Sequence, residues 1–217
     1  ASAVDTAQGG TLVTTLAALG ATGKAGEVTK LASSDAVAAP IIVAVGLGKP
    51  DEDGVIDTEQ LRRAAGVGAR ALAGSSHAVL ALSTTTVDEL SAVAEGGLLG
   101  SYAYLRYRTQ ENDAKQPVQT LTVVSELDDD AARQAVNRAD ITSTSVKLVR
   151  DYVNASPSDL CPDMFADAAR DACAPYDLEF EELDESALAA GGYGGILGVG
   201  QGSIHPPRLV RIAYRHP

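Results

Sequence analysis

The chain has 217 residues, enough for one large domain or for one and a half ordinary ones. It carries 29 Asp and Glu residues against 17 Lys and Arg, a net charge of −12, which argues against nucleic-acid binding because that binding needs cations that displace phosphate counterions. Hydrophobic residues make up 45 %, so a packed core is expected rather than disorder, and no apolar run approaches the ~20 residues that span a bilayer.

The first 45 residues predict one helix and two strands. A helix is expected over residues 11–19, with Gly20 closing it, and a weak strand over 27–31. The sequence IIVAV at 41–45 is a continuous β-branched run, which is typical of a strand buried on both faces.

The next segment alternates helices and strands. Asp57 is placed to cap a helix with a narrow, small-residue face, with Gln60 reaching back to it. A strand over 77–82, a long helix over 87–105 and a strand over 118–124 follow. This alternation indicates an α/β fold with a mostly parallel sheet flanked by helices.

A long helix is predicted from the aspartates at 128–130 to Asn154. At 1.5 Å per residue it would be roughly 40 Å long, and helices of that length often link two domains. We therefore predict an amino-terminal α/β domain over 1–127, a connecting helix over 128–155 and the beginning of a second α/β domain over 156–217.

The second domain is predicted to continue the α/β pattern. A helix begins near Pro162, whose missing N–H is harmless at the first helical position. A strand over 178–183, a short helix over 185–190, a glycine-punctuated strand over 196–200 and a strand over 208–214 follow.

Two glycine-rich segments suggest phosphate loops, and neither fits. The segment 191–203 breaks the dinucleotide pattern G-x-G-x-x-G at Ser203 and leads into a strand instead of a helix. At 20–24, GATGK is too short for a Walker motif, and Ala25 replaces the metal-binding hydroxyl. The glycines of 191–203 are instead expected to allow positive φ angles or close backbone approach. GLGKP at 46–50 is too short to indicate a ligand loop.

The cysteines and histidines do not predict a metal site. Cys161 and Cys173 are expected about 18 Å apart on one helix, too far for a disulfide, which favours a reducing cytoplasm. Cys161, at a helix start, is either an activated thiol or a small buried hydrophobe. The histidines form no H-x-x-x-H pair and no C-x-x-C exists, so a zinc site is not supported. They are His77, expected at a strand edge or surface, His205 and His216.

An acidic run has two interpretations, cation binding or the solvated face of an edge strand, and its alternation with Leu178 and Phe180 favours the second. The run consists of Glu179, Glu181, Glu182, Asp184 and Glu185. Composition alone does not decide on a Ser–His–Asp triad, but no G-x-S-x-G elbow is present. The residues therefore nominate no catalytic group and no metal ligand, and they leave substrate-binding residues unknown.

Two blocks nevertheless match a known family. VNASPSDLCPDMFADAAR at 153–170 and LDESALAAGGYGGILGVGQGSIHPPRLVRIAY at 183–214 resemble the leucyl, or cytosol, aminopeptidases. That family reads N-T-P-P-N-x-L-x-P-x-x-x-A and later G-x-G-x-x-x-G-V-G-Q-G-S, then P-P-R. The corresponding positions here are Asn154, Ser158, Leu160, Pro162, Ala166, Gly192, Gly194, Gly198, Val199, Gly200, Gln201, Gly202, Ser203, Pro206, Pro207 and Arg208. Ser156 departs from the pattern, where the family usually has a proline. Residues 41–50 and 94–109 look like the same family's amino-terminal domain.

The resemblance implies a macro-like amino-terminal domain, a connecting helix and the opening of a catalytic domain. Members are hexameric, and two divalent ions (zinc, manganese, magnesium or cobalt) activate the water that attacks the amino-terminal peptide bond, with leucine preferred. Their metal ligands lie in blocks like G-K-G-x-x-F-D-x-G-G and N-T-D-A-E-G-R, and neither block occurs in this sequence. No catalytic or metal residue is therefore carried over to these residues.

The resemblance thus predicts the front portion of a cytoplasmic aminopeptidase, inactive by itself and without metal ions of its own. The chain begins without Met and stops directly after a strand, so we expect a fragment. Two alternatives remain open: the macro-like domain binds ADP-ribose or a related nucleotide, or it serves as an oligomer-assembly module.

Overall fold

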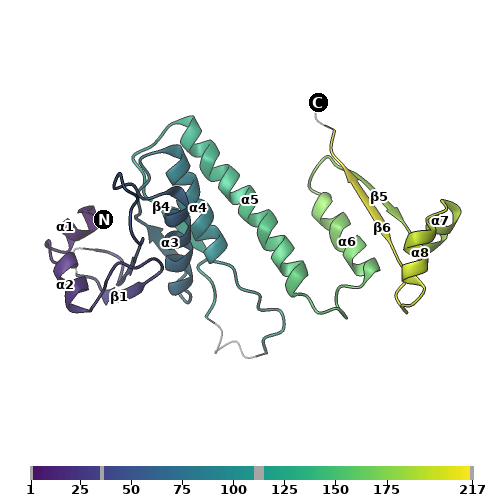
Figure 1. Cartoon of the computed structure of the whole chain (residues 1–217), viewed down its shortest axis with the longest axis horizontal. Helices are drawn as coiled ribbons and strands as arrows, with labels where there is room; N and C mark the ends of the chain where they lie inside the picture. The colour runs from purple at the N-terminus through teal and green to yellow at the C-terminus, as the bar shows by residue number, and fades with distance from the viewer. Residues whose placement is uncertain (1, 35–36, 110–114, 216–217) are drawn as a thin grey trace. The chain divides into compact units, whose positions relative to one another are not determined.

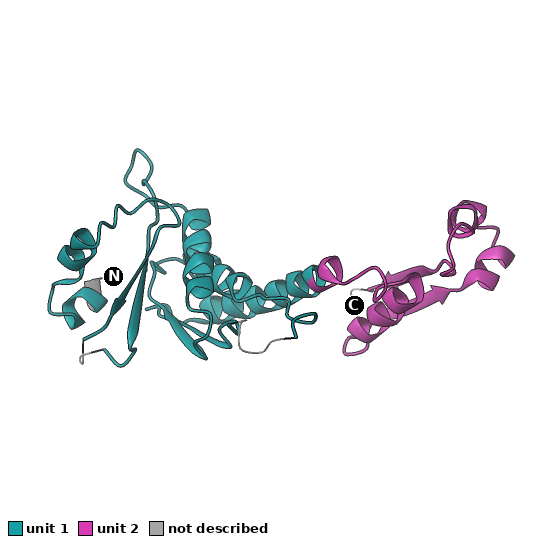
Figure 2. Cartoon of the chain, turned by 90° about the horizontal axis from the view of Figure 1, so that it is seen from below, with its two compact units in different colours: residues 1–150 teal, residues 151–217 magenta. Residues whose placement is uncertain are grey.

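A computed structural model describes residues 2–34, 37–109 and 115–215. The chain divides into two compact units, unit 1 over residues 1–150 and unit 2 over residues 151–217 (Figures 1 and 2). The division falls within the segment predicted to be the connecting helix.

Unit 1 contains helices and short strands, with its last helix continuing into unit 2. In chain order these are α1 (Ser2–Ala7), α2 (Leu12–Ala18), β1 (Val28–Ala32), β2 (Ile41–Val45), α3 (Thr58–Ala71), β3 (His77–Leu80), α4 (Val87–Gly100), β4 (Thr120–Val123) and α5 (Asp130–Asn154). Among the described residues, no helix is both long and apolar enough to cross a membrane.

The strands of unit 1 form two pairs of opposite direction. β3 and β4 are parallel, with His77 opposite Thr120, because the crossover through α4 returns the chain to the same end of the sheet. β1 and β2 are antiparallel, with Val28 opposite Val45, because residues 33–40 are too few for a crossover. The mixed α/β fold is confirmed; among the described strands the parallel arrangement holds for β3 and β4 only. The prediction that 41–45 is buried on both faces is wrong, because Ile41 is 49 % exposed and the other residues of β2 are only half-buried.

The predicted capping box begins α3. The Gln60 amide N–H donates to Asp57 Oδ1 at 2.7 Å, and the Asp57 amide N–H donates to Gln60 Oε1 at 3.0 Å. Gln60 Nε2 also donates to the carbonyl oxygens of Leu47 and Lys49. One side chain therefore satisfies an orphan donor of the helix and anchors the loop that follows β2.

The core of unit 1 depends on two helices that approach each other through glycine. A methyl group added at Gly96 would lie 2.0 Å from the Arg62 carbonyl oxygen, and one added at Gly100 would lie 2.2 Å from that of Gly66. The backbones of α3 and α4 are therefore in direct contact. The hydrophobic cluster beside them consists of Leu61, Ala65, Leu80 and Val93.

Helix α4 ends at Gly100, five residues before the predicted end. Ser101 Oγ donates to the Gly97 carbonyl oxygen at 2.9 Å and satisfies one of the last carbonyls of the helix. The glycines that allow α4 to touch α3 also weaken its last turn. Tyr104 and Tyr107 then pack edge to face, with ring centroids 5.6 Å apart.

Helix α5 has 25 residues. It ends at Asn154, as the sequence predicts, and begins within two residues of the predicted start. The Ala132 N–H donates to Asp129 Oδ1 at 2.8 Å, so one of the predicted aspartates caps the first turn. The buried positions follow the helical period: Ala132, Ala135, Ala139 and Ser143.

Unit 2 contains α6 (Pro162–Cys173), β5 (Glu179–Leu183), α7 (Glu185–Ala190), α8 (Gly194–Gly200) and β6 (Leu209–Ala213). Pro162 occupies the first turn of α6, as predicted. β5 and β6 are antiparallel, with Glu179 opposite Ala213 and Leu183 opposite Leu209. Tyr152 packs edge to face on Phe165 at 5.5 Å between centroids, which holds α6 against the preceding residues of the same unit.

The predicted strand over 196–200 is wrong, because these residues form α8. The Gln201 N–H donates to the Leu197 carbonyl oxygen at 2.9 Å, and the Leu197 N–H donates to the Tyr193 carbonyl oxygen at 3.2 Å. A short apolar run is compatible with either a strand or a helix by pattern alone. Here the backbone N–H groups donate to carbonyl oxygens four residues earlier, as in a helix.

Candidate functional site

Some glycines of segment 191–203 take the predicted backbone roles, a positive φ angle or a close approach. Gly192 has a φ of +75°, a conformation that L side chains rarely adopt. A methyl group at Gly200 would lie 2.6 Å from Pro207 Cγ, so this glycine allows the turn before β6 to pack against α8. These observations explain Gly192 and Gly200 without a ligand, whereas a methyl group added at Gly194, Gly195 or Gly198 would meet nothing within 4 Å.

The Walker-like segment 20–24 has its amide donors occupied by a carboxylate of the protein. Glu27 Oε2 accepts from the Thr22 N–H and hydroxyl, both at 2.9 Å, and from the Lys24 N–H at 3.2 Å. These hydrogen bonds, with that from the Thr22 hydroxyl the strongest, lower the pKa of Glu27 below its usual value. The Glu27 carboxylate therefore occupies the position beside these donors that a bound anion would need.

The loop at 46–50 also has a packing explanation. A methyl group at Gly46 would lie 2.0 Å from the Lys24 carbonyl oxygen, and the Gly48 N–H donates to the Gly23 carbonyl oxygen at 3.0 Å. The glycines of this loop thus allow it to lie against residues 23–24.

Most acidic residues of the run at 179–185 are paired with arginines or cap a helix. Glu181 Oε2 lies 2.7 Å from Arg211 Nε, and Glu179 Oε1 lies 2.9 Å from Arg215 Nε. Asp184 accepts from the Ala187 N–H at 2.8 Å and caps α7, which lowers its pKa. The exposed residues Glu179 and Glu181 fit the predicted solvated strand face.

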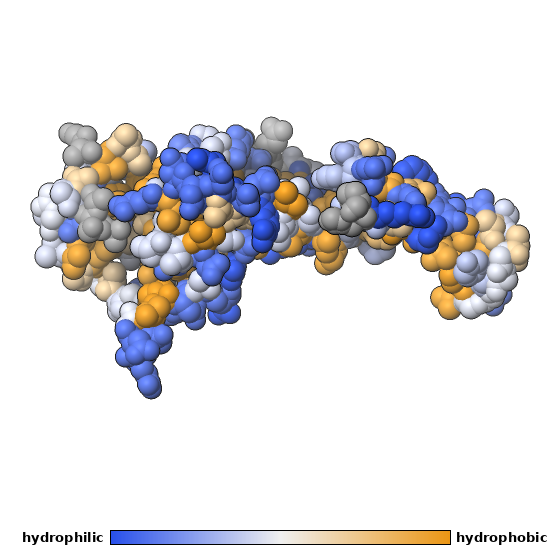
Figure 3. All heavy atoms as spheres, turned by 90° about the horizontal axis from the view of Figure 1, so that it is seen from above, coloured by the Kyte–Doolittle hydropathy of each residue, from blue (hydrophilic) through white to orange (hydrophobic). Residues whose placement is uncertain are grey.

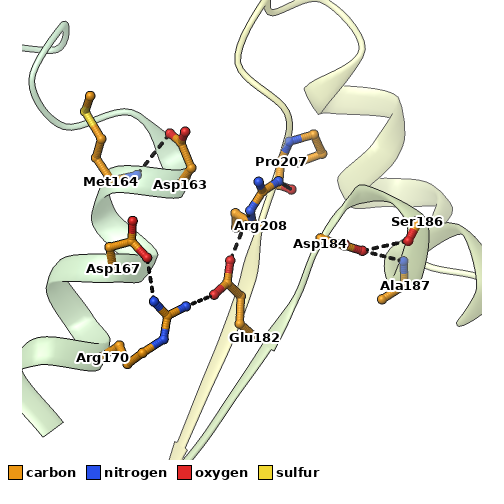
Figure 4. A network of polar contacts seen from close by, with 10 residues as sticks. All are labelled: Asp163, Met164, Asp167, Arg170, Glu182, Asp184, Ser186, Ala187, Pro207 and Arg208. Atoms are coloured by element: carbon orange, nitrogen blue, oxygen red, sulfur yellow. Dashed lines mark hydrogen bonds and ion pairs between the residues drawn. The ribbon is translucent and has the colours of Figure 1, made fainter. Parts of the chain in front are cut away.

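Glu182 lies at the centre of a polar network that joins α6, β5 and β6 (Figure 4). It forms an ion pair with Arg170 of α6, and its Oε1 lies 3.1 Å from Nε of Arg208, the residue before β6. Arg170 also pairs with Asp167 at 2.5 Å, and this contact raises the pKa of the guanidinium. Arg170 lies over the Phe180 ring, 5.3 Å from its centroid. The network fixes α6 to the two-stranded sheet of its unit.

The two histidines among the described residues, His77 and His205, have different surroundings. His77 is exposed at the start of β3, as predicted, and its Nε2 lies 2.9 Å from Thr122 Oγ1 on β4. His205 Nε2 lies 3.4 Å from Cys161 Sγ, a contact that the sequence did not predict because 44 residues separate the two. His216 lies outside the described residues.

Both cysteines are free, as the spacing predicts, and both are buried. Cys161 is the N-cap residue of α6 and Cys173 its last residue.

Unit 1 has a groove of ≈ 620 Å³ between α4, β4 and α5. Its lining is mainly apolar, with polar groups along α5: Leu90, Ala94, Leu98, Leu121, Val123, Ser125, Leu127, Ala132, Arg133, Val136, Asn137 and Asp140. Figure 3 shows hydrophobic residues in separate groups among hydrophilic ones on the viewed face.

No metal centre is present in the part of the chain that the structure describes. There, no group of three or more His, Cys, Asp or Glu side chains could hold a metal ion. The described residues therefore do not fit a two-metal centre.

Two family models match the sequence. Residues 1–111 match the N-terminal domain of the cytosol aminopeptidase family, and residues 147–217 match its catalytic domain. The chain belongs to the cytosol aminopeptidase family. The resemblance seen in the sequence is confirmed, including the order of the N-terminal domain and catalytic-domain sequence.

Curated members of the cytosol aminopeptidase family support this assignment along the whole chain. A probable cytosol aminopeptidase of Streptomyces griseus is 47 % identical over 99 % of this chain, and one of Streptomyces coelicolor is 41 % identical over 100 %. The chain spans 44 % and 45 % of the length of these relatives.

Solved structures of similar proteins agree with the fold. The bottromycin maturation enzyme BotP in complex with Mn has a TM-score of 0.79 and 28 % identity, covering 94 % of this chain and 42 % of BotP. A mutant of tomato leucine aminopeptidase has a TM-score of 0.80 over 98 % of this chain and 43 % of its own. At 21 % identity, the tomato structure supports the fold alone.

Proposed function

We propose that these residues are the N-terminal portion of a metal-dependent aminopeptidase that removes amino-terminal residues, leucine preferred, from peptides. The observation that carries the proposal is the catalytic-domain match over 147–217, together with relatives named probable cytosol aminopeptidases at 41–47 % identity. Within the protein, residues 1–127 would form the macro-like domain, 128–155 the connecting helix and 156–217 the beginning of the catalytic domain.

The metal ions of the proposed enzyme are two divalent cations, zinc, manganese, magnesium or cobalt, and BotP, a similar protein, has a structure in complex with Mn. The described residues do not fit such a centre, since they contain no three-ligand group and most carboxylates near β5 are bound to arginines or to a helix N-terminus. We therefore assign no catalytic or metal residue to this chain and attribute no chemical step of peptide hydrolysis to its side chains.

The role left for these residues is structural. The α3–α4 contact and the Glu182 network hold each unit in shape, and unit 1 is proposed to take part in self-association to a hexamer in the cytoplasm. No described feature favours a nucleotide site, because Glu27 and residues 23–24 occupy the glycine loops. Titration with ADP-ribose in a calorimeter is expected to give no heat.

An assay with a chromogenic leucine amide tests the proposal. The 217-residue chain is expected to show no turnover with added manganese or zinc, whereas the full-length Streptomyces griseus relative should show turnover that a chelator abolishes. A matched control is the relative shortened to the region that aligns with this chain. Chelator-sensitive turnover by either short protein would contradict the structural role, and an inactive full-length relative would contradict the proposed activity.

A further inference from the structure

The start of α6 brings a thiol and an imidazole together from distant parts of unit 2. Cys161 Sγ lies 3.4 Å from His205 Nε2, and it also lies 3.5 Å from the carbonyl oxygen of Pro157 and 3.9 Å from that of Ser158. Of these three neighbours only the imidazole is a base that can take up the thiol proton. Cys161 is 5 % exposed, whereas residues 201–206, which include His205, are exposed.

Cys161 lies at the positive end of the α6 dipole. It is the N-cap residue of a twelve-residue helix and makes no side-chain cap hydrogen bond. The positive end of the helix dipole and a neighbouring imidazolium both stabilise a thiolate. One group opposes it: the carboxylate of Asp163 lies in the first turn, where it accepts the Met164 N–H at 3.0 Å.

The same helix contains a natural comparison. Cys173 is equally buried, at 7 % exposure, but it lies at the C-terminal end of α6, where the dipole disfavours negative charge. The two thiols therefore share a helix and a degree of burial but differ in local electrostatics.

We propose that Cys161 and His205 form a reactive thiol site whose sulfur is modified by small electrophiles. The natural reactants belong to the class of peroxides, of which hydrogen peroxide is the simplest. The thiol proton moves to His205 Nε2, and the thiolate attacks one peroxide oxygen. An S–O bond forms as the O–O bond breaks, and the departing hydroxide takes the proton from the imidazolium to give water. The sulfur is oxidised to a sulfenic acid, and the peroxide is reduced. This site does not depend on the proposed aminopeptidase function.

Limited alkylation of the full chain with iodoacetamide tests the proposal. Trypsin cleavage at Arg170 separates Cys161 and Cys173 into different peptides, so mass spectrometry gives both rates from one sample. Cys161 is expected to react about tenfold faster than Cys173. The substitution His205→Gln should reduce this preference to the part that the helix dipole alone supplies, whereas His77→Gln, which changes a histidine of unit 1, should leave it unchanged. Equal rates in the unaltered chain, or a preference that His205→Gln does not diminish, would overturn the proposal.

A second measurement decides the matter if His205→Gln opens unit 2 and raises both rates. The unaltered chain is treated with hydrogen peroxide in the presence of a cyclic 1,3-dione, which captures sulfenic acids. The expected result is a dione adduct at Cys161 and little at Cys173. An adduct absent from Cys161, or equal at the two cysteines, would show that the pair is not a reactive site.

Discussion

The contacts that stabilise unit 1 internally differ from those that stabilise unit 2. In unit 1, α3 and α4 touch through glycines beside the buried side chains of Leu61 and Val93. In unit 2, Leu188 is the one large hydrophobic residue described as fully buried, while Val199 and Ile204 are 85 % and 92 % exposed. There the ion pairs of Glu182 connect the helix to the sheet. Unit 1 thus has more large buried side chains, although Arg62 and Glu95 also form an ion pair between α3 and α4. In unit 2 the ion pairs of Glu182 accompany a smaller set of buried hydrophobic residues.

The largest effect is expected from the substitution Gly96→Ala in unit 1. The new methyl group would lie 2.0 Å from the Arg62 carbonyl oxygen, so α3 and α4 must separate. We expect the free energy of unfolding to fall by about 3 kcal/mol, measured by urea denaturation. The control is Gly68→Ala on α3, whose methyl group meets only Val45 Cγ2 at 3.4 Å. Equal effects of the two substitutions would show that the close contact does not limit stability.

An intermediate effect is expected from Glu182→Gln in unit 2. The neutral amide leaves the guanidinium groups of Arg170 and Arg208 without their shared counter-charge. Hydrogen exchange of α6, β5 and β6 should become several-fold faster, with that of α3 and α4 unchanged. Glu181→Gln serves as the matched control, because its pair with Arg211 is exposed and such pairs contribute little. Unchanged exchange in Glu182→Gln would remove the contrast between the units.

The smallest effect is expected from Glu27→Gln, and it depends on pH. Because folding lowers the pKa of Glu27, its stabilisation of unit 1 is complete at neutral pH and is lost as pH falls below the ordinary value of 4.5 and through the lower folded value. The substitution should therefore destabilise the chain at pH 7 but much less at pH 3. Glu126→Gln, at another exposed position of unit 1, is the control. A loss that is equal at both pH values would contradict the role of the carboxylate.

Local signals in the sequence predicted much of the fold. Asp57 and Gln60 lie three residues apart, so their capping box could be identified from the sequence alone. The alternating pattern at 178–183 predicted β5 for the same reason. The pattern failed at 196–200, where an apolar run with glycines fits both helix and strand, and hydrogen bonds to Tyr193 and Gln201 decide for the helix.

The partners of the candidate site residues were harder to predict from the sequence. The sequence contained the acidic run and Cys161 but did not reveal their partners, because Arg208 and His205 follow Glu182 and Cys161 by tens of residues. A local signal did exist for Glu27, because it lies within five residues of the donors that it satisfies.

The sequence by itself determined the family, through the two glycine and proline blocks, and the order of most helices and strands, through side-chain period and capping residues. Only the tertiary structure decided which charges neutralise one another, which glycines admit a neighbouring backbone, and that a thiol meets an imidazole. The physical reason is that periodicity and capping act over a few residues, whereas ion pairs, close packing and side-chain contacts depend on segments that the fold brings together.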